Sequence, residues 1–163
     1  MEQRHGSGIT ARRGLLLSGL AMVGASAALA TDRPLAAAGN AGNIEQPEVA
    51  DPAHFMARAQ AMRALAIETG DQAYGAVVAK EGRIVGQAPS RVVVNHDPTA
   101  HAETEAIRDA ARRLGTADLS GCRLFSTSRA CQMCETAAYW AQIDAMVHGA
   151  ALEDVGHPQY RRC

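Results

Sequence analysis

The chain has 163 residues, of which 47% are apolar and only 4% aromatic, and its formal net charge is −1. This length leaves room for one domain with a core of aliphatic side chains, which favours a small α/β fold. The near-neutral charge and the scattered arginines exclude a basic stripe of the kind that binds a nucleic-acid backbone, so we expect no structured nucleic acid as a partner.

The first 30 residues have the pattern of a cleaved export signal. Arg12 and Arg13 precede an uncharged run rich in Gly, Ala and Ser at residues 14–30, and Asp32 follows soon after. The run is short for a membrane-spanning helix, so the pattern predicts a removed leader and no permanent membrane span. A retained anchor and an unprocessed extension are the alternatives. The adjacent arginines are typical of twin-arginine signals, which predicts a periplasmic or extracellular protein.

Residues 31–50 contain Pro, Gly and Asn without apolar periodicity, and they predict a flexible linker. The folded domain is expected to occupy residues 51–163. Asp51 is placed to cap a first helix, and Pro52 fits its first turn. Apolar side chains then recur at helical spacing until Gly70, which is expected to end the helix.

A β-hairpin is predicted after this helix. Residues 74–79 form a short apolar run, and residues 83–87 form a second strand. Lys80, Glu81 and Gly82 between them are typical of a tight turn. The two strands should therefore be antiparallel neighbours.

The remaining elements alternate between helix and strand. Helices are predicted at residues 99–114 and 129–141, and strands at residues 122–126 and 145–149. Ser128 is the expected cap of the third helix. Connections of this length imply at least one parallel strand pair. The order of elements therefore predicts a mixed sheet inside a three-layer α/β/α sandwich.

Side chains suited to metal binding or proton transfer lie at the starts of the second and third helices. Cys131 and Cys134 are three positions apart and share one helix face, where unpaired amides favour thiolates. His101 supplies a third ligand, and three protein ligands leave the fourth position of Zn²⁺ open for water, as in catalytic sites. We therefore predict zinc held by His101, Cys131 and Cys134. Glu103, close to a ligand without being one, is the predicted catalytic acid and base.

Other interpretations of the cysteines stay open. A lone C-x-x-C in an exported protein is more often a disulfide or redox pair, so a thiol-redox protein that uses Cys131 and Cys134 is an alternative. Cys122 falls in a predicted apolar strand, which indicates a buried structural thiol. Cys163, the last residue, has no predicted role.

The residues around the expected zinc ligands match a known pattern. Residues 97–103 read D-P-T-A-H-A-E, and residues 131–143 follow C-x-M-C…A-x-Y-W-A-x-I. H-x-E followed by C-x-x-C is a signature of zinc deaminases. The chain resembles the cytidine/deoxycytidylate deaminase superfamily, most of all its guanine deaminase and tRNA adenosine deaminase branch.

This resemblance implies a cytidine deaminase-type fold and a zinc-dependent hydrolase that removes an amino group from a purine base or nucleoside, with guanine favoured. It also implies a homodimer, and it places Ser90 and Ala102 at the substrate. The family normally continues through another strand and helix. By this comparison the fold is shortened at its carboxy terminus.

The chain departs from the family pattern at positions near the site. Arg129 and Ala130 stand where members usually have Glu-Pro, and Ser90 stands where purine-specific members have Asn. Three interpretations of Arg129 stay open: it stabilises the thiolates, attracts an anionic group of the substrate, or points into solvent. These departures support a second hypothesis, a zinc-binding pseudoenzyme or interaction module that binds a base or a partner without turnover.

Overall fold

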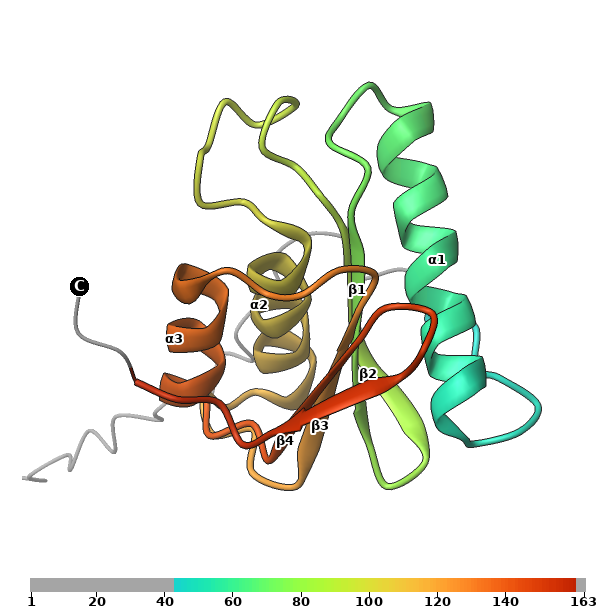
Figure 1. Ribbon diagram of the computed structural model, residues 1–163, viewed down its shortest axis with the longest axis vertical. Coiled ribbons are helices and arrows are strands. Elements are labelled where there is room, and N and C mark those ends of the chain that lie inside the picture. Colours follow the sequence, from blue (N-terminus) through green and yellow to red (C-terminus); the bar gives the residue numbers. More distant parts are fainter. Residues whose placement is uncertain (1–42, 161–163) are drawn as a thin grey trace, which may run out of the picture. The chain divides into compact units, whose positions relative to one another are not determined.

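A computed structural model of the chain describes residues 43–160 (Figure 1). The expected export signal at residues 1–30 and most of the expected linker lie outside these residues. Among the helices in the described range, none is both long enough and apolar enough to cross a membrane.

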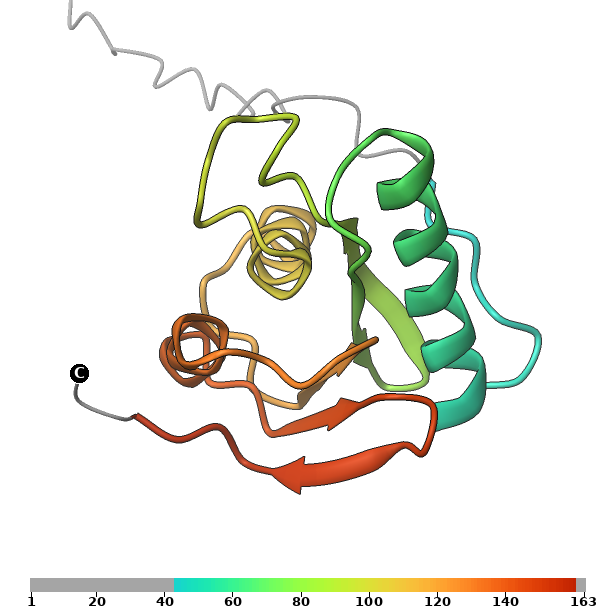
Figure 2. The same cartoon turned by 45° about the horizontal axis from the view of Figure 1, so that its top comes forward.

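The described part of the chain forms a mixed sheet covered by helices on both faces. Its elements are α1 (Pro52–Glu68), β1 (Gly75–Lys80), β2 (Arg83–Pro89), α2 (Ala102–Leu114), β3 (Cys122–Ser126), α3 (Gln132–Trp140), β4 (Ala145–His148) and β5 (Glu153–Gly156). The strand order is β2-β1-β3-β4-β5, with β3 and β4 parallel and the other neighbours antiparallel. Helix α1 covers one face, and α2 and α3 cover the other (Figures 1 and 2). The predicted three-layer α/β/α sandwich is confirmed.

The central strands β1, β3 and β4 bury side chains on both faces, because each face is covered by helices. Adjacent residues point to opposite sides, with Val77, Phe125 and Val147 towards α1 and Val78, Leu124 and Met146 towards α2 and α3. On the α1 side the rings of Phe55 and Phe125 pack with their centroids 5.2 Å apart. The sheet therefore separates two apolar cores.

The helix cap and the hairpin turn in the first half of the chain form as predicted. The Asp51 carboxylate accepts a hydrogen bond from the amide of His54 at 2.8 Å and caps α1, and Pro52 is its first residue. Between β1 and β2, Glu81 and Gly82 have φ of 49° and 76°. Two positive φ angles in a two-residue loop are typical of a type I′ turn, whose twist matches that of the strands.

The packed domain begins before Asp51, where the sequence indicated a linker. The Gln46 side chain donates to the Ile84 carbonyl at 2.9 Å and accepts from the Ile84 amide at 2.8 Å. Ile44 packs against the core on the α1 side. Gln46 thus occupies hydrogen-bonding groups on the outer edge of β2, which is an edge strand.

The helices α2 and α3 begin later than predicted, at Ala102 and Gln132. Before α2, the Asp97 carboxylate accepts from both the amide and the hydroxyl of Thr99 at 2.7 Å, so this segment forms a turn instead of the first helical residues. These hydrogen bonds from Thr99 also hold the pKa of Asp97 below its usual value. Before α3, the Ser128 carbonyl accepts from the Ser126 hydroxyl at 2.7 Å, and Cys131, not Ser128, is the N-cap.

Strand β5 was not predicted, because its residues are mostly charged or exposed. It pairs antiparallel with β4. Polar contacts hold it in place: Arg123 of β3 forms an ion pair with Asp154, and His148 of β4 lies 3.0 Å from Glu153. No apolar alternation marks such a strand in the sequence.

Helix α2, which carries two of the site residues, lies unusually close to β2. A Cβ added at Gly86 would lie 2.6 Å from the Ala106 carbonyl oxygen and 2.6 Å from the Ala110 nitrogen. We expect Gly86→Ala to push α2 away from the sheet and to lower the free energy of unfolding by about 3 kcal/mol. Thermal unfolding should show a loss of about 10 °C in Tm.

The control for this prediction is Gly115→Ala at the end of the same helix. Gly115 has φ of 67° and open space around it, so alanine there meets only backbone strain of about 1 kcal/mol. Equal losses in the two variants would contradict a packing role for Gly86.

Candidate metal and catalytic site

His101 and Cys131 occupy equivalent positions at the starts of two neighbouring helices. His101 is the N-cap of α2 and Cys131 is the N-cap of α3, and both have an extended backbone. Neither side chain forms the usual capping hydrogen bond to its own helix. Both side chains are therefore available for a shared contact between the two helix starts.

The three predicted ligands meet at this point. The Sγ atoms of Cys131 and Cys134 are 3.7 Å apart, and His101 Nδ1 lies 3.7 Å from the first and 3.6 Å from the second. At Zn–S distances of about 2.3 Å and Zn–N distances of about 2.1 Å, tetrahedral coordination separates two sulfurs by about 3.8 Å and a sulfur from a nitrogen by about 3.6 Å. The spacing of the three atoms therefore fits zinc.

The chemistry of the donors also fits zinc. Two sulfurs and one imidazole nitrogen form a ligand set that is typical of zinc. Mg²⁺ and Ca²⁺ instead favour oxygen ligands. A disulfide would place the sulfurs about 2.05 Å apart. Cys131 and Cys134 are free thiols in this structure. The reduced form of a redox pair also has free thiols, so the thiol-redox alternative stays a hypothesis.

Glu103 lies beside this group without belonging to it. Its side chain projects from the first turn of α2, with Oε2 3.7 Å from Cys134 Sγ, and the residue is only 5% exposed. Burial raises the pKa of Glu103 above its ordinary value, and its own backbone amide and His101 only partly oppose this. A carboxyl group with a pKa moved towards neutrality can both accept and donate a proton near neutral pH.

Cys134 is the most enclosed of the three ligands. Burial, together with the charge of Glu103, raises the pKa of the Cys134 thiol. A bound cation acts in the opposite direction, because coordination stabilises the thiolate. The amino-terminal end of α3, where both cysteines lie, adds a favourable partial charge for thiolates.

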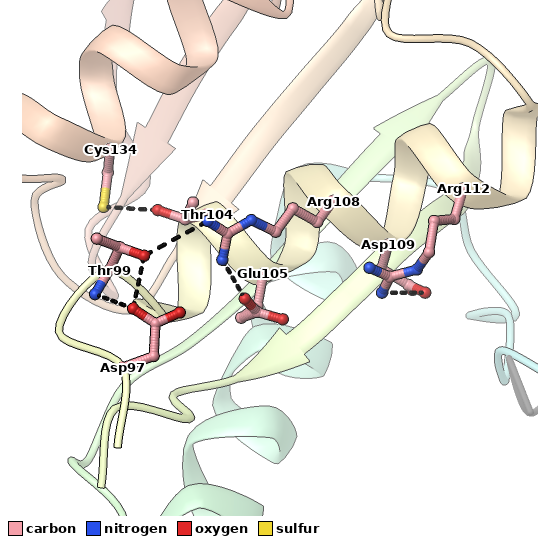
Figure 3. Close-up of polar contacts among 8 residues, drawn as sticks. All are labelled: Asp97, Thr99, Thr104, Glu105, Arg108, Asp109, Arg112 and Cys134. Atoms are coloured by element: carbon pink, nitrogen blue, oxygen red, sulfur yellow. Dashed lines mark hydrogen bonds and ion pairs between the residues drawn. The ribbon is translucent and has the colours of Figure 1, made fainter. Parts of the chain in front are cut away.

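Thr104 is a neighbour of the site that the sequence did not indicate. Its hydroxyl lies 3.5 Å from Cys134 Sγ, and the residue is buried. Figure 3 shows it directed from α2 to the sulfur, close to the polar contacts that join Thr99, Arg108 and Glu105. A threonine in the first turn of a helix has no sequence feature that indicates this contact.

We expect Thr104→Val to weaken zinc binding by roughly tenfold, the lower end of the effects known for residues that hydrogen-bond to metal ligands. Valine keeps the shape of the side chain and removes only the hydroxyl. Competition with a chromophoric chelator measures the zinc Kd. Thr104→Ser, which keeps the hydroxyl, should restore most of the affinity. Unchanged affinity in the valine variant would show that the hydroxyl has no effect on Cys134.

The group opens into a cleft of about 540 Å³. Its lining includes the site residues His101, Glu103 and Cys131. The other lining residues are Gln72, Tyr74, Ser128 and Arg129. This volume is within the range of about 300–1,000 Å³ that small-molecule sites occupy. Sequence reasoning missed Gln72 and Tyr74 as lining residues, because they lie in the segment before β1 and only the fold brings them to α2 and α3.

The two expected substrate-binding residues do not line this cleft. Ser90 is fully buried at the end of β2, and its hydroxyl has no hydrogen-bond partner among the described residues. Ala102 is the buried first residue of α2, where backbone amides lack partners within the helix. Their contact with a substrate stays a prediction.

Known proteins resemble the chain in this region. A guanine deaminase from Bacillus subtilis (strain 168) is 41% identical over 81 residues, which are 50% of this chain and 52% of that protein. A tRNA-specific adenosine deaminase from Aquifex aeolicus (strain VF5) is 42% identical over 85 residues, 52% of this chain and 56% of that protein. The chain thus spans about half the length of these curated relatives.

Solved structures agree with this comparison. The X-ray structure of the Bacillus subtilis guanine deaminase superimposes with a TM-score of 0.57 at 37% identity, over 59% of this chain and 62% of that one. Residues 49–150 match the family model of the cytidine and deoxycytidylate deaminase zinc-binding region. Since this match covers more than half of the sequence, the chain belongs to the cytidine and deoxycytidylate deaminase family.

Proposed function

We propose that the protein catalyses the zinc-dependent hydrolytic removal of an amino group from a purine base, with a guanine-type base as the first candidate. The observation that carries this proposal is the meeting of His101, Cys131 and Cys134 at zinc-ligand spacing, with the buried Glu103 carboxyl beside them. A structural zinc site would need a fourth protein ligand, whereas three protein ligands leave a position for water.

The chemistry requires a nucleophile and a group that moves protons. Zinc bound by these three residues supplies an activated water near neutral pH. In the reaction the water oxygen bonds to the ring carbon that carries the amino group, the C–N bond breaks, and ammonia leaves. Glu103 accepts one proton from the water and delivers it to the ring nitrogen, and then transfers the remaining proton of the added hydroxyl to the departing amine. Guanine would give xanthine.

The choice of a purine is supported by the names of the related proteins, which include guanine deaminase and tRNA-specific adenosine deaminase. The near-neutral net charge of −1 favours a small molecule over a folded RNA. The open cleft beside Glu103 has the size of a small-molecule site.

Zinc-loaded full-length protein should be tested against guanine, guanosine, adenine, adenosine, cytosine and cytidine, with ammonia release as the readout. We expect turnover of at least one purine and the fastest turnover with a guanine-type base. If the folded, zinc-loaded protein releases no ammonia from any of the six, the proposal fails. Base binding without ammonia release would favour the pseudoenzyme hypothesis.

We also propose that the protein is exported through the signal expected at residues 1–30. The twin-arginine route carries folded proteins, which suits a metal site that is assembled before transport. Fusion of residues 1–35 to a reporter tests this, and a reporter that stays in the cytoplasm would overturn it.

A further inference from the structure

The arginines of the described part of the chain fall into two groups. Those in the first group form ion pairs with carboxylates: Arg58, Arg108, Arg112, Arg113 and Arg123. The second group has no carboxylate within 4.0 Å among the described residues and comprises Arg63, Arg83, Arg91 and Arg129. Their positive charges are therefore not neutralised by a neighbouring side chain.

Two of these four arginines, Arg63 and Arg129, line clefts that share wall residues. Arg129 lines the cleft that contains His101 and Glu103. Arg63 lines a second cleft of about 550 Å³, and Gln72, Tyr74 and Ser128 belong to the walls of both. The two clefts are thus neighbours, and Glu103 is the only acidic residue among the described residues that line them.

The charged residues of the two clefts differ in burial and lie on different elements. Glu103 is buried in the first turn of α2. Arg129 is exposed in the loop between β3 and α3, and Arg63 projects from α1 in the adjoining cleft. Arg63 uses its Nε atom to donate to the Ala73 carbonyl at 3.0 Å, which fixes the side chain against the cleft wall. A ligand whose reacting part lies at Glu103 would extend outwards past two unpaired guanidinium groups.

Guanidinium groups present a planar fork of donors that matches a phosphate group. A cleft lined by charges of one sign also concentrates ligands of the opposite sign. We propose that the substrate is a purine nucleotide, with its base beside Glu103 and its phosphate at Arg129 and Arg63. This inference rests on the proposed function and names the form in which the base is bound.

Kinetics on matched substrates test the proposal. The kcat/KM for ammonia release should be measured with guanosine and guanosine 5′-monophosphate, or with the adenosine pair if that base is the one turned over. We expect the monophosphate to be preferred by about tenfold, through a lower KM and not a higher kcat. The preference should fall as salt rises, because exposed charges are screened.

Arg129→Gln should reduce the preference for the monophosphate to near unity, with a smaller reduction in Arg63→Gln. The matched control is Arg83→Gln, an exposed arginine at the hairpin end of β2, which should keep the tenfold preference. Equal kcat/KM for the two substrates in the active wild-type protein would overturn the inference. A preference that survives Arg129→Gln would overturn it as well.

Binding measurements separate this inference from the proposed function. Calorimetry with the zinc-loaded Glu103→Gln variant compares the affinities of guanosine and its monophosphate without turnover. Tighter, Arg129-dependent binding of the monophosphate with no turnover in the wild type would support the inference and reject the proposed function. Turnover without a phosphate preference would do the reverse. A short single-stranded oligonucleotide tests the other source of phosphate. If the protein prefers the oligonucleotide to the monophosphate, the assignment of a free nucleotide as the substrate is overturned.

Discussion

Glu103→Gln is expected to lower the rate of ammonia release by about 10³-fold, within the range of about 10²–10⁴ for the loss of a general acid or base. Glutamine has nearly the same shape as glutamate and can still donate and accept hydrogen bonds, but it cannot take a proton from water. The loss should therefore appear in kcat. Steady-state assays with the best substrate of the panel measure it.

Zinc content separates this effect from damage to the metal site. The Glu103→Gln variant should hold as much zinc as the wild type, because Glu103 is a neighbour of the ligands and not one of them. Glu105→Gln is the matched control, since Glu105 lies on the same helix and pairs with Arg108 at the surface. Activity of Glu103→Gln within tenfold of the wild type would contradict the assignment of Glu103.

Cys134→Ser is expected to abolish stoichiometric zinc binding and to remove the stability that zinc provides. A serine oxygen is a much weaker zinc ligand than a thiolate, and the remaining His101 and Cys131 give only two protein ligands. At a free zinc concentration of about 1,000 times Kd, the metal stabilises the fold by about 4 kcal/mol. Chelation should therefore lower the Tm of the wild type by roughly 10–15 °C and leave that of the variant unchanged.

Metal analysis after dialysis, together with thermal unfolding with and without a chelator, measures both effects. Cys122→Ala is the control, because Cys122 is a buried thiol of β3 outside the ligand group. It should keep its zinc and its response to the chelator. If Cys134→Ser retains one zinc per chain after dialysis, the ligand set is wrong.

Much of this protein follows from short-range features of its sequence. The Asp51 cap and the Glu81-Gly82 turn depend on contacts between residues a few positions apart, so they were predicted at the right positions. His101 and Cys131 were predicted to lie near helix starts, because helix starts can be located approximately from capping and turn residues. Their residue types identify them as metal ligands from the sequence alone.

The exact helix starts required more than these local features. Asp97 could begin a helix or close a turn with Thr99, and the fold selects the turn, which makes His101 the N-cap. The same selection at Ser128 and Cys131 turns both ligands towards one point. A competition between two local structures of similar energy is decided by packing.

Only the tertiary structure decided the surroundings of the site. Thr104 faces Cys134 because α2 and α3 pack side by side on one face of the sheet. Arg63 comes from α1 on the other face, and it lines a cleft that shares wall residues with the cleft of Glu103. Strand β5 forms through pairing with β4 and through ion pairs to neighbouring strands, without an apolar pattern of its own. Contacts between residues far apart in the chain leave no periodic signal, so the sequence alone determined the chemistry of the ligands and the fold determined what surrounds them.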